Sequence, residues 1–173
     1  MARTTFSGPV RSMRGFISAG PDAVVNITAE TTLTFADHAG KLIEINDADG
    51  AVTLPSLKAN SKAASAGEND PNVINHQGAV YRFFVGTDAT DLDIKTDGTD
   101  KFVGSIMVAV NDGSKKSFIP NGSSNDVISL NGSTTGGDKN SYIEITALAS
   151  AEYLVQGVLI GSGTIATPFA DSW

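Results

Sequence analysis

The sequence predicts an all-β domain, an antiparallel β-sandwich or β-barrel with extended arms at both ends. First, residues 142–148 and 153–160 are β-prone runs joined by four small or polar residues, which is typical of a β-hairpin. Second, turn residues recur about every ten positions between short runs rich in β-branched and aromatic residues. Third, 18 Gly with 40% hydrophobic and 18% charged residues is a composition typical of short strands joined by turns.

The hairpin is expected at the centre of the domain. In its first run, Ile143, Ile145 and Ala147 fall on one side of a period-2 pattern, and polar or amphipathic residues fall on the other. The second run, 153–160, has apolar residues on both sides. We therefore expect this second strand to be covered on both faces, with the other strands packed around the hairpin.

The remaining strands follow from the same pattern. Turns are indicated at 46–50, 97–98 and 111–113, each containing an Asp-Gly step suited to a positive φ angle. Residues 56–78 predict a long loop and a candidate contact surface. The expected strands are 23–28, 31–35, 41–45, 51–54, 79–85, 92–96, 102–110, 117–119 and 126–130.

The chain divides into an extended basic N-terminal arm (1–21), the β domain (22–160) and a C-terminal arm (161–173). The N-terminal arm bears aromatic residues and has no acid before Asp22. A basic, aromatic arm on an acidic body suggests docking onto another protein, and a frayed terminus or a first strand on its own sheet is the alternative. In the C-terminal arm, Phe169 and Trp173 suit either a neighbouring subunit or a return to their own chain.

Charge and composition exclude several classes of function. The net charge of −7 argues against non-specific nucleic-acid binding by the domain. No apolar run approaches the length of a membrane span, and no signal peptide is expected because residues 1–11 lack an apolar segment. The absence of Cys excludes disulfides and thiolate metal sites, and it fits assembly in a cytoplasm.

Local signatures of catalysis and cofactor binding are weak. Residues 161–166 match the relaxed dinucleotide pattern G-x-G-x-x-A, but a helix must follow, and Pro168 and the nearby end of the sequence given oppose one. His38 and His76 lie in no recognised catalytic context, so solvated loop positions are expected. The Asp-rich turns are explained by backbone capping, and none matches a calcium-binding loop, although the sequence alone leaves ion binding there open. No cofactor, metal site or enzymatic activity is therefore expected.

Three Asn residues fit the acceptor pattern for glycosylation: Asn26, Asn121 and Asn131. Asn-Gly and related turns explain these positions more simply, because no secretion signal accompanies them.

The chain also shows a family resemblance. The segments that carry it are Thr5-Phe6-Ser7-Gly8-Pro9-Val10-Arg11-Ser12 with Gly15-Phe16, then Val52-Thr53-Leu54-Pro55, Tyr81-Arg82-Phe83-Phe84-Val85 and Ile94, and finally Gly137-Asp138, Tyr142–Ile145 and Tyr153-Leu154-Val155-Gln156-Gly157. In these segments the chain resembles small virion structural proteins of tailed bacteriophages, and most closely the head decoration, or cement, proteins. The similarity spans most of the chain.

The resemblance implies a non-enzymatic protein that binds the outer surface of a phage head, after assembly in the host cytoplasm, and bridges major capsid protein subunits. It implies a homo-oligomer, with a trimer favoured, and it brings no catalytic residues, nucleic-acid partner or membrane partner. We expect the capsid-docking residues to be Arg3, Phe6, Arg11, Arg14 and Phe16, and Phe169 and Trp173 to make the subunit contact.

Two other functions stay open at this stage. A tail-fibre or receptor-binding β-module would recognise a host glycan or surface protein through an aromatic patch, but one Trp and three Tyr offer little for sugar stacking. A glycan hydrolase would need two carboxylates at a fixed separation, and the sequence offers no way to select a pair.

Overall fold

The computed structural model describes residues 12–13, 19–57, 77–149 and 151–171. These ranges contain no helix that is both long and apolar enough to cross a membrane. The helices are η1 (Pro21–Ala23, a 3₁₀ turn) and α1 (Phe35–His38). The strands are β1 (Val24–Ile27), β2 (Thr31–Thr32), β3 (Leu42–Ile45), β4 (Ala51–Thr53), β5 (Val80–Val85), β6 (Leu92–Lys95), β7 (Lys101–Val110), β8 (Lys115–Phe118), β9 (Val127–Leu130), β10 (Tyr142–Ala149), β11 (Glu152–Gly161) and β12 (Phe169–Ala170).

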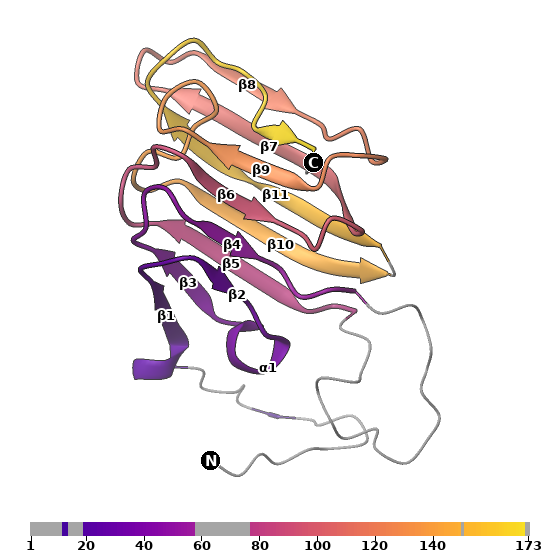
Figure 1. Ribbon diagram of the computed structural model, residues 1–173. Helices are drawn as coiled ribbons and strands as arrows, with labels where there is room; N and C mark the ends of the chain where they lie inside the picture. The colour runs from indigo at the N-terminus through magenta and orange to yellow at the C-terminus, as the bar shows by residue number, and fades with distance from the viewer. Residues whose placement is uncertain (1–11, 14–18, 58–76, 150, 172–173) are drawn as a thin grey trace.

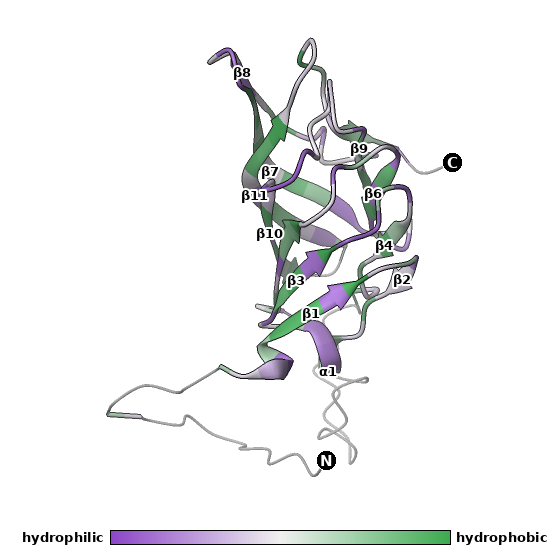
Figure 2. Cartoon of the chain, turned by 90° about the vertical axis from the view of Figure 1, so that its left-hand side faces the viewer, coloured by the Kyte–Doolittle hydropathy of each residue, from purple (hydrophilic) through white to green (hydrophobic). Residues whose placement is uncertain are grey.

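The strands form a sandwich of two sheets, as Figures 1 and 2 show. The large sheet has the order β1-β3-β5-β10-β11-β7-β8, and the small sheet has the order β12-β9-β6-β4-β2. The predicted all-β sandwich is therefore confirmed. The expectation of purely antiparallel pairing is wrong, because both sheets are mixed: β1, β3 and β5 pair in parallel, as do β2, β4 and β6.

The parallel pairs arise because the first six strands wind as a coil. The chain crosses from the large sheet to the small one through residues 28–30, 46–50 and 86–91. Its first two returns, to β3 and then to β5, are to the strand beside the one it left, so β1, β3 and β5 run in the same direction. Three turns of coil stack in this way, and the alternating burial of each strand is the same as in an antiparallel meander.

The β10–β11 hairpin closes the gap between the coil and β7. It is antiparallel, as predicted, and it occupies the middle of the large sheet, with β5 on one side and β7 on the other. Its turn contains Ala151 at a φ angle of 70°. The expectation that the second strand is covered on both faces is wrong, because Val158 is 40% exposed.

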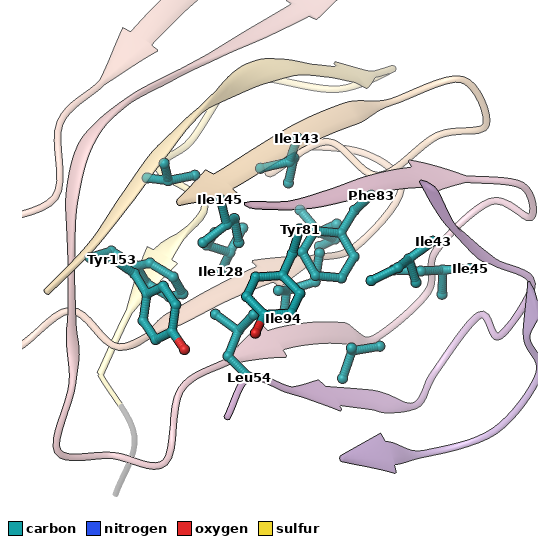
Figure 3. Packing of buried hydrophobic residues seen from close by; sticks show 14 of the residues in the cluster. Ile43, Ile45, Leu54, Tyr81, Phe83, Ile94, Ile128, Ile143, Ile145 and Tyr153 are labelled. Atoms are coloured by element: carbon teal, nitrogen blue, oxygen red, sulfur yellow. The ribbon is translucent and has the colours of Figure 1, made fainter. Parts of the chain in front are cut away.

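The core lies between the two sheets (Figure 3). One row of inward-facing positions runs across all seven strands of the large sheet: Val25, Ile43, Phe83, Ile143, Gly157, Ile106 and Phe118. The five residues between the two ends are flanked by strands on both sides, and the four of them with large side chains are at most 1% exposed. Burial of each such side chain contributes roughly 1.5–3 kcal/mol relative to exposure.

The C-terminal segment stays on the sandwich as far as the structure describes it. β12 pairs antiparallel with β9, and Phe169 is 7% exposed within the hydrophobic core. The expected extended arm therefore does not leave the domain between 161 and 171, and the Phe169 side chain packs on its own chain rather than projecting toward a neighbour. Trp173, the predicted second contact residue, lies outside the described residues.

Candidate interaction surface

The outer face of the large sheet carries an apolar row. Phe84 on β5, Tyr142 on β10, Val158 on β11 and Met107 on β7 are consecutive cross-strand partners. Tyr142 is 38% exposed and Val158 is 40% exposed, while Phe84 and Met107 are half-buried. Neighbouring side chains on a sheet face lie close enough to form a continuous contact area.

A polar row runs beside the apolar one and is held by its own bonds. Arg82 Nε lies 3.1 Å from Glu144 Oε2, and Gln156 Nε2 donates to Glu144 Oε1 at 3.0 Å. Arg82 Nη1 also donates to the Gly40 carbonyl oxygen at 3.3 Å. The Arg82–Glu144 pair is part-exposed and adds little to stability. It does fix the polar groups in place, so the apolar row has a defined border.

The outer face of the small sheet is different. Its cross-strand neighbours are Thr53 beside Lys95, and Asp93 beside Ala51 and Ser129. These positions carry small or polar side chains, as expected of a face that meets water. Within the described ranges, therefore, only the outer face of the large sheet carries a row of large apolar side chains. Contiguous exposed apolar patches bordered by polar residues mark interaction sites.

The Asp-rich and Asn-Gly turns are closed by their own side chains. Asp97 Oδ1 accepts from the Thr99 N–H at 2.9 Å, and Asp112 Oδ1 accepts from the Ser114 N–H at 2.7 Å. Asn121 Oδ1 accepts from the N–H groups of Ser123, Ser124 and Asn125, and Asn131 Oδ1 accepts from those of Ser133 and Thr135. The capping explanation is therefore confirmed for the turns at Asp97, Asp112, Asn121 and Asn131, whereas Asp88 Oδ1 accepts from the distant Lys139 N–H at 2.7 Å. No group of three or more potential metal-ligating residues is found in the described part of the chain.

Two carboxyl groups at the end of β6 differ in their pKa. Burial raises the pKa of Asp100, whose Oδ2 accepts from the Leu57 N–H at 2.7 Å. For Asp97, burial also acts to raise the pKa, but hydrogen bonds from Ser56 and from the backbone N–H groups of Asp100 and Thr99 outweigh it and lower the pKa. Both carboxyls lie in the turn that joins β6 in the small sheet to β7 in the large one, and both accept hydrogen bonds there.

Two tyrosines point into the core near Leu54 (Figure 3). The Tyr153 hydroxyl donates to the Pro55 carbonyl oxygen at 2.5 Å. The Tyr81 hydroxyl is buried without a hydrogen-bond partner among the described residues. Burial raises the pKa of Tyr81 to about 12 and raises that of Tyr153 further. Both rings are fully covered, so they act as packing residues.

The other predicted positions fall as follows. The five predicted docking residues, Arg3, Phe6, Arg11, Arg14 and Phe16, lie outside the described residues, as does His76. His38 ends α1, and its Nδ1 accepts from the Thr34 N–H at 3.0 Å, which is a local structural role. No helix follows residues 161–166 in the described segment to 171, so the rejection of the dinucleotide pattern is confirmed.

The apolar outer row was missed at the sequence level, although a signal was present. Phe83 and Phe84 are adjacent, so a strand at 79–85 must place one of them on each face. The two-sided run at 153–160 was interpreted as a covered strand. Together these runs indicate a large apolar outer face on neighbouring strands. No family model, curated protein or solved structure matches the chain.

Proposed function

We propose that this chain is a non-enzymatic virion structural protein, a decoration or cement protein that binds the outside of a phage head. The observation that carries the proposal is the apolar row on the outer face of the large sheet, with Tyr142 and Val158 at its centre. The resemblance to phage decoration proteins supplies the class of partner, the major capsid protein.

The two outer faces suit such a role. A cement protein needs one face against the shell and another toward solvent. The apolar row provides the first, and the polar face containing Thr53, Lys95 and Asp93 provides the second. Each contact is small, so stable attachment relies on many copies acting on one lattice. The N-terminal arm residues add further contact area on the shell.

Binding to empty heads assembled from a phage major capsid protein tests the proposal. Val158→Glu places a charge in the apolar row and should abolish co-sedimentation with shells while the thermal unfolding midpoint changes little, because Val158 is 40% exposed. Thr53→Glu makes the same charge change on the polar outer face and should bind as wild type. Full binding by Val158→Glu would contradict the proposed docking face.

Deleting residues 2–16 tests the arm separately. We expect a folded domain that no longer decorates shells. Full occupancy by the truncated protein would remove the arm from the proposal. Immunogold labelling that marks tail tips rather than shells would contradict the decoration function altogether and favour receptor binding.

A further inference from the structure

The inward-facing row of core residues runs across the large sheet from one open edge to the other. Among the described residues, no strand pairs with the outer edge of β1 or with that of β8, which lie at opposite ends of the sheet (Figure 1). The inward-facing row that crosses the sheet begins at Val25 on β1 and finishes at Phe118 on β8. Both residues pack against the core and are only partly buried. At each edge, therefore, one core residue remains only partly covered.

Each edge also exposes a large apolar neighbour. Val24 is 45% exposed, and Ile119, directly after β8, is 79% exposed. Open sheet edges with apolar side chains are templates for pairing with another chain.

The charges at the two edges are opposite. β8 carries Lys115 and Lys116, whereas Glu44 lies beside β1 on β3, and Glu30 follows β1 in the turn to β2. None of these four side chains forms an ion pair within the described ranges. Two β8 edges would bring lysines together, and two β1 edges would bring glutamates together. Like charges thus oppose pairing of identical edges, and only unlike edges attract.

A groove beside β8 provides room for a neighbour. Its volume is about 890 Å³, and Val110, Lys115, Lys116 and Ile165 are among its lining residues. It opens where the β7–β8 turn and the 162–165 segment diverge. A turn bearing an acidic side chain, such as the turn containing Glu30, would meet the two lysines there.

We propose that β1 of one copy of this chain pairs antiparallel with β8 of the next copy. The direction follows from the pairing within one sheet. β1, β3 and β5 run the same way, β10 runs opposite to β5, and β11 and β7 run opposite to β10. β8 is antiparallel to β7, so it runs opposite to β1. Continuing the inward-facing row from one copy to the next sets Val25 opposite Phe118. Val24 then faces Ile119, and Lys115 and Lys116 meet the end of β1, near Glu30 and Glu44.

This contact is head-to-tail, so it generates a closed ring when the rotation between copies closes and an open row when it does not. The inference rests on the proposed function only for the choice of a closed trimer. Its test uses purified protein without shells, so either proposal can fail alone.

A charge exchange tests the contact by sedimentation velocity of the full chain. Wild type should form a discrete oligomer that weakens with added salt. K115E/K116E and E30K/E44K should each lower the association constant at least about tenfold, a change that corresponds to roughly 1.4 kcal/mol. Combining all four substitutions in one chain should restore the oligomer, because the attraction is then reversed at both edges.

K95E/K139E is the matched control. It changes the net charge as much as K115E/K116E does, but at positions away from both edges of the large sheet, and it should leave the oligomer intact. Circular dichroism checks that every variant is folded. A wild-type chain that is monomeric at every soluble concentration, or equal loss in K115E/K116E and the control, would overturn the proposal. Loss of the oligomer on deleting residues 2–16 with none in K115E/K116E would also overturn it.

Engineered cysteines give a direct readout because the chain has none of its own. Val24 and Ile119 flank opposite edges of one sheet, about 29 Å apart at ~4.8 Å per strand, so a disulfide between them cannot form within one copy. Oxidised V24C/I119C should give a ladder or a closed covalent ring whose mass counts the copies. Covalent species no larger than those of V24C and I119C alone would contradict the edge-to-edge contact.

Discussion

The Nζ atom of Lys101 lies 2.7 Å from Oδ2 of Asp126, and this ion pair joins the two sheets of the sandwich. Lys101 begins β7 in the large sheet, and Asp126 directly precedes β9 in the small sheet. The Asp126 side chain is 2% exposed and that of Lys101 is 22% exposed. Lys101 Nζ also donates to the Gly98 carbonyl oxygen at 2.7 Å. The charges are therefore held at the rim of the core.

Lys101→Met should lower the free energy of unfolding by about 3 kcal/mol, because it leaves the Asp126 carboxylate buried without its cation. Chemical denaturation of Lys101→Met, Asp126→Asn and the double variant measures the coupling. We expect the double variant to lose clearly less than the sum of the two single losses. Additive losses would mean that the pair does not act as a unit.

The two core tyrosines should respond differently to loss of their hydroxyl groups. Tyr81→Phe removes a buried hydroxyl that has no partner among the described residues, so we expect a neutral effect or a gain of up to about 1 kcal/mol. Tyr153→Phe removes the bond to the Pro55 carbonyl and should cost about 1 kcal/mol. Thermal unfolding compares them, and a larger loss in Tyr81→Phe would reveal a partner for that hydroxyl.

Gly104 in β7 should tolerate no side chain. Its φ angle is +107°, and a Cβ atom there would collide with the Val155 carbonyl oxygen on β11. Gly113 has a φ angle of +87° but open space around the Cβ position. Gly113→Ala should therefore cost only the backbone strain, about 1 kcal/mol, and Gly104→Ala at least about 3 kcal/mol. Equal losses in denaturation would show that β7 and β11 are not so closely paired.

Stability should depend on pH through Asp100. Burial raises the pKa of this carboxyl above its ordinary value of 3.8, so the fold disfavours the ionised form. That unfavourable contribution is complete above the raised pKa and disappears as the pH falls below 3.8. Asp100→Asn keeps an acceptor for the Leu57 N–H but cannot ionise.

The unfolding free energy of wild type minus that of Asp100→Asn should therefore increase between pH 7 and about pH 3. Urea denaturation at several pH values measures this difference. Asp97 is present in both proteins, so its own titration largely cancels. A difference that decreases on acidification would mean that Asp100 is stabilised as an anion.

Much of the architecture could be predicted from local pattern. The hairpin at 142–160 and the turns at Asp97 and Asn121 follow from alternation and turn chemistry, which are local properties. The coil of the first six strands could not be predicted, since parallel and meandering strands have the same alternation of burial. The short helix α1 was not predicted, and its first residue, Phe35, was assigned to a strand at 31–35, because four residues carry no helical period.

The candidate surface was harder to predict than the fold. An apolar run on both faces indicates a covered strand or an exposed docking face equally well, and Val158 belongs to the second class only because no element covers β11 within the described ranges. Phe169 shows the converse: this aromatic residue, expected to contact a neighbouring subunit, packs in the core of its own chain because β12 extends the small sheet. Both outcomes depend on long-range packing.

The central claim is that the outer face of the large sheet meets a capsid. Cryo-electron microscopy of the native particle tests it most directly. The account predicts density for this chain on the exterior of the shell, with Tyr142 and Val158 against the major capsid protein and the small sheet turned toward solvent. Density for the chain at the tail tip, or on the shell with the small sheet against the capsid protein, would contradict it.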